Sequence, residues 1–136
     1  MTTYFDTNVL LYAFAKNSDN IEQSIISTNL VENAIAYDSL IISSVVLCEF
    51  AFVSNKINEC KNTVDKNLEF LSSFVQPEPY GIHKRVSQIF ESESLYISSF
   101  DIYHLAFAEY YDAKLVTFDK GFKKLQATSN VEIEIL

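Results

Sequence analysis

The stretch Thr2–Phe14, TTYFDTNVLLYAF, decides the fold. Its first four residues alternate polar and apolar side chains and include β-branched and aromatic types, a pattern that predicts a short strand. Residues 8–15 carry apolar side chains on every side over about two turns, which predicts a helix that is buried on most faces. Asp6 therefore lies where a strand passes into a helix.

Two interpretations of Asp6 follow from this position. In an open parallel sheet, the carboxyl ends of the strands form the edge at which ligands bind. A carboxylate at that edge, beside the positive end of a helix, can stay ionised and face an incoming cation. Alternatively, Asp6 only caps the helix, a position that aspartate commonly occupies. This stretch alone leaves both interpretations open.

Length and composition predict one α/β domain that spans residues 1–136. The chain has only 2 glycines and 2 prolines, which favours long helices joined by short connections. No apolar run reaches the ~18 residues of a membrane span, and no secretory signal precedes the first strand, so we expect a cytoplasmic protein without a membrane partner. Cys48 and Cys60 form no CxxC pair, and we expect two reduced thiols, with Cys48 in the core.

The formal net charge of −8 argues mildly against a nucleic-acid partner, because acidic chains repel phosphates unless cations or a local basic patch intervene. The same charge is compatible with carboxylates gathered around a metal ion, or with a basic protein partner. The basic cluster His83–Arg85 is interpreted as a solvated helix face, with a phosphate or partner contact as the alternative.

Helices and strands are predicted to alternate along the rest of the chain. This alternation predicts a mostly parallel sheet of five strands with helices on both faces. Besides the first strand and helix, we expect helices at residues 20–37, 44–53, 61–72, 80–93 and 98–113, and strands at 40–43, 74–75, 114–118 and 131–135.

Three further acids occupy informative positions. Glu49 is the one charged residue in the apolar stretch Ser44–Val53, where a carboxylate is costly unless it is paired or coordinates a metal. The alternative is an exposed seam or a basic partner. Asp101 falls in the first turn of a predicted helix, which the helix dipole alone explains. Asp119 follows a strand directly, as Asp6 does.

All four acids are expected to point into one crevice at the carboxyl end of the sheet. Oxygen ligands of this kind suit Mg²⁺ or Mn²⁺, and without cations the carboxylates would raise one another's pKa. His104 lies one turn after Asp101. We interpret it as a structural residue with no essential role.

Four ordered segments resemble the PIN-domain ribonucleases, and among them the VapC-like toxins of bacterial toxin–antitoxin pairs. They are FDTNVLLYAF, SSVVLCEF, SFDIYHLAFA and LVTFDKGF, at residues 5–14, 43–50, 99–108 and 115–122. The resemblance implies a PIN-like three-layer sandwich, Mg²⁺- or Mn²⁺-dependent endonuclease action on RNA, a homodimer and inhibition by a cognate antitoxin. It also implies catalytic and metal-ligand roles for Asp6, Glu49, Asp101 and Asp119, with Asn8 and Thr117 in support.

Two alternatives stay open. The first is a non-catalytic module that keeps this fold as a protein-binding platform. The second is a phosphatase of the haloacid-dehalogenase type, because FDTNVL looks like the DxDx[TV][LV] signature, although Asn8 replaces its second aspartate. For a protein partner, some of the aromatic residues Tyr12, Phe14, Phe50 and Phe52 are expected to line a groove or a dimer face.

Overall fold

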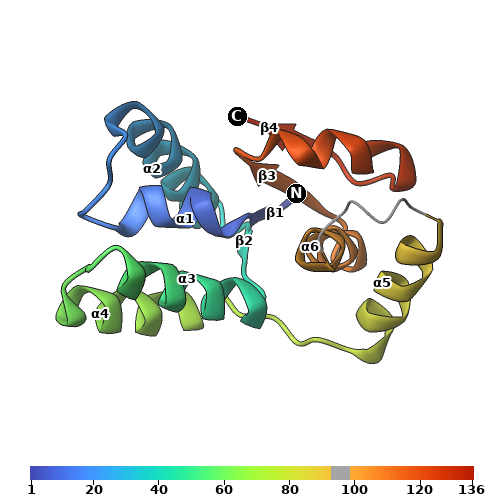
Figure 1. Ribbon diagram of the computed structural model, residues 1–136, viewed down its shortest axis with the longest axis horizontal. Coiled ribbons are helices and arrows are strands. Elements are labelled where there is room, and N and C mark those ends of the chain that lie inside the picture. The colour runs from blue at the N-terminus through green and yellow to red at the C-terminus, as the bar shows by residue number, and fades with distance from the viewer. Residues whose placement is uncertain (93–98) are drawn as a thin grey trace.

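The computed structural model describes residues 1–92 and 99–136 of the chain (Figure 1). The elements in chain order are β1 (Thr2–Phe5), α1 (Thr7–Phe14), α2 (Ile21–Ala36), β2 (Leu40–Ile41), α3 (Ser44–Lys56), α4 (Lys61–Ser72), α5 (Tyr80–Ser92), α6 (Ser99–Tyr110), β3 (Ala113–Thr117), the 3₁₀ helix η1 (Lys120–Thr128) and β4 (Ile133–Ile135). The helices agree with those predicted to within a few residues. The predicted ends at Glu93 and Ser98 lie outside the described residues.

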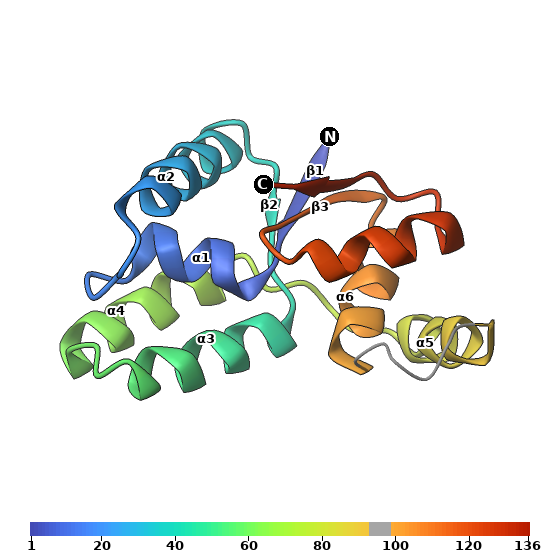
Figure 2. The same ribbon diagram turned by 45° about the horizontal axis from the view of Figure 1, so that its top comes forward.

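The strands form a parallel sheet in the order β2-β1-β3-β4, and helices flank it on both sides (Figures 1 and 2). The central strands β1 and β3 are apolar on both faces because both faces are covered, and Tyr4, Phe5, Leu115 and Val116 are all buried. This arrangement confirms the predicted α/β class and the predicted edge strand near the carboxyl terminus.

The sheet has four strands rather than the predicted five. Residues 74–75 contribute only an isolated parallel bridge between Val75 and Ile42. The backbone N–H of Gln76 still donates to the carbonyl of Ile42, at 2.9 Å. Pro77 follows at once and has no N–H to donate, so the ladder ends there.

Side-chain caps determine where the first helices begin. Asp6 caps α1, Asn20 caps α2 by accepting from the N–H of Gln23, and Ser43 caps α3 by accepting from the N–H of Val46. The strand expected at residues 40–43 therefore ends two residues earlier, at Ile41, and Ser43 caps the following helix instead. Ser43 is fully buried, which gives its hydroxyl the structural role described below.

The apolar stretch at the beginning of α3 is buried on only part of the helix surface. Val46, Phe50 and Ser54 are buried, whereas Cys48 is exposed and Phe52 is 69% exposed. Residues four apart share a helix face, so the packing of α3 on α1 and α4 buries one apolar row and leaves the row of Cys48 and Phe52 outside. Both cysteines are free thiols, as expected, but Cys48 does not lie in the core.

The predicted apolar stripe of α2 is likewise only partly buried. Val31 and Ala34 are buried with Ser27, while Ile21 and Ile25 are exposed. A helix shows its apolar positions by periodicity, but which of them meets the core depends on the elements packed against it. In the part of the chain that the structure describes, no helix is both long enough and apolar enough to cross a membrane.

Candidate active site

The sheet register brings the ends of β1 and β3 together at the carboxyl edge. Phe5 is paired with Val116, so Asp6 lies beside Thr117. The buried hydroxyl of Thr117 donates to Asp6 Oδ2 at 2.9 Å and accepts from the backbone N–H of Asp119 at 2.9 Å. One hydroxyl thus connects the two acids that follow neighbouring strands.

Asp6 combines the two interpretations that the sequence left open, because it caps α1 and also lies at the carboxyl edge of the sheet. Its Oδ1 accepts from the backbone N–H of Thr7 at 2.8 Å, which caps α1, and its Oδ2 is held by Thr117. The side chain is 13% exposed and lies beside His104, whose Nε2 is 3.9 Å from Oδ1. Asp6 is therefore a helix cap that also lies in the cluster of acids.

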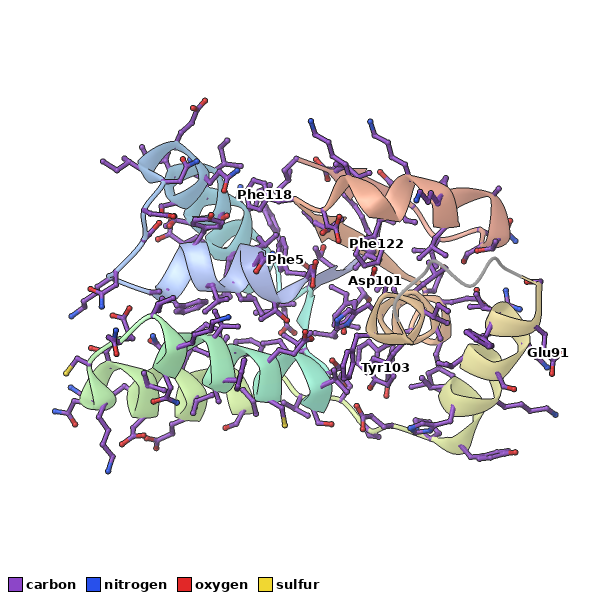
Figure 3. All side chains as sticks on the ribbon, viewed as in Figure 1. Phe5, Glu91, Asp101, Tyr103, Phe118 and Phe122 are labelled. Atoms are coloured by element: carbon purple, nitrogen blue, oxygen red, sulfur yellow. The ribbon has the colours of Figure 1, made fainter. Side chains whose placement is uncertain are left out.

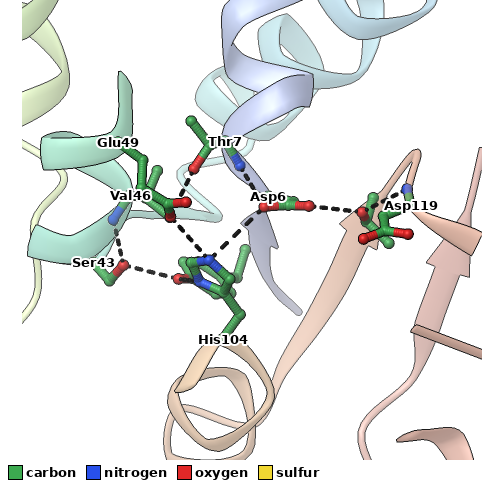
Figure 4. A network of polar contacts seen from close by, with 9 residues as sticks. Asp6, Thr7, Ser43, Val46, Glu49, His104 and Asp119 are labelled. Carbon is green, nitrogen blue, oxygen red and sulfur yellow. Dashed lines mark hydrogen bonds and ion pairs between the residues drawn. The ribbon is translucent and has the colours of Figure 1, made fainter. Parts of the chain in front are cut away.

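Glu49 reaches this cluster from α3. Its Oε1 accepts from the hydroxyl of Thr7 at 3.1 Å and contacts His104 Nε2 at 3.0 Å (Figure 4). Partial burial acts to raise the pKa of Glu49, but these hydrogen bonds and the nearby imidazole outweigh it and lower the pKa. The side chain is 35% exposed, and neither Lys nor Arg is its partner among the described residues.

Asp101 and Asp119 complete the cluster from α6 and η1. Asp101 lies in the first turn of α6 (Figure 3). Burial, followed by repulsion from Asp119 and Asp6, raises the pKa of Asp101. Asp119 is exposed, and its Oδ1 accepts from the N–H of Gly121 at 2.8 Å. A Cβ atom at residue 121 would lie 3.0 Å from that oxygen, so glycine allows this close approach. Together, these contacts and couplings bring all four predicted acids to one edge.

Several residues that complete the site were missed by reasoning from sequence. Thr7 is buried and connects Asp6 to Glu49. His104 is 2% exposed, its Nδ1 is 2.7 Å from the hydroxyl of Tyr4, and that hydroxyl is 2.8 Å from Ser43 Oγ. A tyrosine in a buried strand and a histidine in an apolar helix both need polar partners. That need was the one signal in the sequence that could have indicated a contact between Tyr4 and His104.

Asn8 is placed differently from the predicted supporting role. It is exposed in the first turn of α1, and its side chain makes no hydrogen bond with another described residue. It lines a hollow of about 310 Å³ with Tyr12 and Val53, between α1 and α3. Among the six predicted site residues, Asn8 and Asp101 have side chains that make no hydrogen bond with another described residue, and Asn8 also has no resolved charge coupling to the acids.

The carboxylate oxygens at this edge are donor atoms of the kind that a hard divalent cation prefers. In the described part of the chain, no group of three or more His, Cys, Asp or Glu side chains is arranged so that it could hold a metal ion. Mg²⁺, however, is usually bound through one or two carboxylates, with waters and substrate phosphates as its other ligands. Glu49 Oε2, Asp119 Oδ2 and both oxygens of Asp101 accept no hydrogen bond from another described residue, so these oxygens remain for a cation.

The fold and the site define a parallel α/β protein with an acidic centre at the carboxyl edge of its sheet. The family model of the PIN domain matches residues 3–127, and the chain therefore belongs to the PIN-domain family. No protein with a curated description matches the chain.

Three solved structures share the fold over most of the chain. The toxin–antitoxin complex from Klebsiella pneumoniae is 21% identical, with 89% of this chain and 90% of that chain covered and a TM-score of 0.65. VapBC2 from Rickettsia felis, bound to a DNA fragment from its promoter, is 22% identical, with 99% and 98% covered and a TM-score of 0.70. FitAcB from Neisseria gonorrhoeae is 18% identical, with 98% and 96% covered and a TM-score of 0.70.

Proposed function

We propose that this protein is a metal-dependent endoribonuclease and the toxin of a toxin–antitoxin pair, acting in the cytoplasm. The observation that supports it most is the gathering of acids at the carboxyl edge of the sheet. Thr117 connects Asp6 to Asp119, and Thr7 and His104 hold Glu49 beside them. Burial and the charges of Asp119 and Asp6 raise the pKa of Asp101, the fourth acid. Membership of the PIN-domain family supports nuclease chemistry. It also disfavours the haloacid-dehalogenase alternative, whose fold belongs to another family.

In this proposal, Asp6, Glu49, Asp101 and Asp119 hold Mg²⁺ or Mn²⁺. When bound, such an ion lowers the pKa of a water molecule and stabilises the charge that develops on a phosphodiester during hydrolysis. Thr117 and Thr7 hold the oxygens of Asp6 and Glu49 in place through the hydrogen bonds described above. The chain's own contribution is to keep these carboxylates oriented before substrate arrives.

An acidic protein needs a local basic surface to approach RNA. Three of the ten basic residues, Lys120, Lys123 and Lys124, are exposed on η1, which begins directly after Asp119. In a 3₁₀ helix, residues three apart share a face, so Lys120 and Lys123 point the same way. In contrast, Arg85 pairs with Glu109 at 2.7 Å. The lysines of η1 therefore offer phosphate contacts next to the acids.

A protein partner is part of the same proposal. The structural neighbour from Klebsiella pneumoniae is named as a toxin–antitoxin complex, which supports an antitoxin as the partner here. The hollow beside Asn8 and Tyr12 lies near the acids and offers a place for it. The exposed side of α3 with Phe52 is a candidate surface for the homodimer. Phe50 is core, and Phe14 packs against it.

The test is incubation of the purified protein with total cellular RNA, with Mn²⁺ and with EDTA, followed by mapping of the cut ends. We expect cleavage only with Mn²⁺, and loss of cleavage in Asp6→Asn, which removes a charge but keeps the shape. Circular dichroism should show that the variant is folded. Full activity in a folded Asp6→Asn protein would contradict the mechanism.

The same experiment distinguishes a nuclease from the remaining alternative, a module that only binds other proteins. A non-catalytic interaction module would leave RNA intact under every condition. Thermal melting with and without Mn²⁺ adds a measurement that needs no cleavage, because a ligand that binds only the folded state raises the melting temperature. Intact RNA together with an unchanged melting temperature would favour the interaction module.

A further inference from the structure

We propose that His104 is a positioning residue that holds Glu49 in the active site, and that Tyr4 holds His104 in the tautomer required for this. The proposal rests on the proposed nuclease function for its kinetic consequence. It replaces the expectation from sequence that His104 has no essential role. The structural reason is that both ring nitrogens of this buried imidazole have partners at the acidic edge (Figure 4).

The directions of the hydrogen bonds assign the tautomer. A carboxylate only accepts hydrogen bonds, so the 3.0 Å contact with Glu49 requires a proton on His104 Nε2. In a neutral imidazole, Nδ1 is then the acceptor, and the hydroxyl of Tyr4 donates to it at 2.7 Å. Ser43 Oγ accepts from the N–H of Val46 at 3.1 Å and contacts the same tyrosine oxygen at 2.8 Å.

These contacts connect three elements that the chain brings together from distant positions. Tyr4 lies in the central strand β1 and is fully buried, and Ser43 is the buried cap of α3. His104 on α6 is separated by 100 residues from Tyr4 and by 55 from Glu49. The imidazole therefore connects a side chain on α3 to the core of the sheet.

Glu49 depends on such an anchor because its side chain is long and 35% exposed. Fixing several rotatable bonds costs conformational entropy, which hydrogen bonds from buried donors offset. Thr7 and His104 both engage Oε1, so they fix the carboxylate while Oε2 accepts no hydrogen bond from a described residue. Loss of His104 leaves Thr7 as the single described anchor and lets the carboxylate turn away from the site.

The kinetic experiment compares His104→Leu and His104→Gln with the wild type. Outer-shell partners of this kind typically change activity or metal affinity by about 10–100-fold. We expect kcat to fall by about that factor in His104→Leu and the half-saturating Mn²⁺ concentration to rise, with KM for RNA little changed. His104→Gln, which keeps an N–H donor near the Nε2 position, should recover part of the loss.

His83→Leu is the matched control, because His83 is the other histidine and is exposed on α5. It should keep wild-type kcat. A folded His104→Leu protein with wild-type kcat and wild-type Mn²⁺ dependence would overturn the proposal. If the leucine variant does not fold, Tyr4→Phe carries the same test, since it keeps the imidazole and removes the hydroxyl that contacts Nδ1 and Ser43 Oγ.

A second measurement does not depend on nuclease activity. Long-range ¹H–¹⁵N correlation spectra report which ring nitrogen carries the proton, and a chain with two histidines gives a simple spectrum. We expect the Nε2-protonated form for His104 in the wild type and a mixture of tautomers in Tyr4→Phe. A His104 protonated only on Nδ1 in the wild type would refute the positioning role, whether or not the protein cleaves RNA, because Nε2 would then have no proton to donate to Glu49. Inactivity of the wild type with the expected spectrum would instead refute only the nuclease function.

Discussion

At the scale of single residues, Asp6 and Asp101 show that two partly buried aspartates in similar positions can differ in their hydrogen-bond partners. Asp6 and Asp101 both lie at the beginning of a helix, where the helix dipole favours a negative charge. Asp6 has both oxygens engaged in hydrogen bonds. Asp101 has no such partner among the described residues, and its neighbours raise its pKa. The raised pKa means that the ionised carboxylate of Asp101 is disfavoured in the folded protein.

This difference predicts that Asp101→Asn stabilises the metal-free protein. A folded-state pKa raised above 3.8 means that ionised Asp101 destabilises the fold at neutral pH, and that this penalty disappears as the pH falls through the raised pKa. In EDTA, we expect Asp101→Asn to melt at a higher temperature than the wild type at pH 7, with a smaller difference toward acidic pH.

The matched control for this prediction is Asp65→Asn, which removes one negative charge from an exposed position on α4. It should change the melting temperature little at either pH. Added Mn²⁺ should reverse the order of the two proteins, because the wild type gains more from the cation. A lower melting temperature for Asp101→Asn in EDTA would show that its carboxylate stabilises the fold.

At the scale of elements, the helices could be predicted well, but their buried faces could not. Apolar periodicity and caps located each described α-helix within a few residues, but they did not predict the 3₁₀ helix η1. The exposure of Ile21, Cys48 and Phe52 could not be predicted, since periodicity shows an apolar row but not the element that packs against it. A strand was expected at residues 74–75, but the structure has only an isolated β-bridge there, because Pro77 ends the backbone pairing.

A second element-scale feature joins two loops through one buried acid. Glu59, in the connection between α3 and α4, is 7% exposed. Its two oxygens accept from the backbone N–H groups of Lys16 and Asn17, at 3.0 and 3.1 Å. These amides belong to the connection between α1 and α2. Unlike Glu49, this carboxylate is satisfied by backbone donors, so its role is structural.

We therefore expect Glu59→Ala to lower the free energy of unfolding by about 1–3 kcal/mol, since two amides lose their acceptor in a buried place. Urea denaturation measures this change, and hydrogen exchange should speed up at Lys16 and Asn17. Glu91→Ala is the control, because Glu91 is exposed on α5. Equal stability of the Glu59→Ala protein and the wild type would show that these hydrogen bonds make no net contribution to the free energy of unfolding.

At the scale of the whole molecule, the sequence predicted which acids lie at the same edge of the sheet, but it did not predict the residues that hydrogen-bond to them. Asp6 and Asp119 each follow a strand of the same sheet, and strand ends converge in any parallel α/β fold. The supporting network is different, because it depends on contacts across long separations, such as 111 residues between Thr117 and Asp6. Thr7, Tyr4 and Ser43 have no local pattern that marks them, and His104 was judged alone, without its partners.

The last prediction concerns the surface that a partner would cover. Tyr12 lines two adjoining hollows of about 310 and 430 Å³, the first with Asn8 and Val53 and the second with exposed Ile21 and Ile25. Apolar hollows with an aromatic residue at their junction favour an apolar segment of another chain. If an antitoxin lies there, one of its basic side chains can reach the acidic edge and compete with the cation for the same carboxylates.

We expect the product of the neighbouring gene to bind this protein tightly and to inhibit cleavage, with activity returning after the partner is removed by proteolysis. Tyr12→Ala should weaken the complex by about tenfold or more, because a central aromatic anchor typically contributes over 1 kcal/mol. Tyr37→Ala is the matched control, since Tyr37 is 83% exposed at the end of α2 and lines neither hollow. Equal losses in the two variants would place the partner elsewhere. A neighbouring product that neither binds nor inhibits would contradict the toxin–antitoxin pairing and leave the nuclease chemistry to be judged by the RNA assay alone.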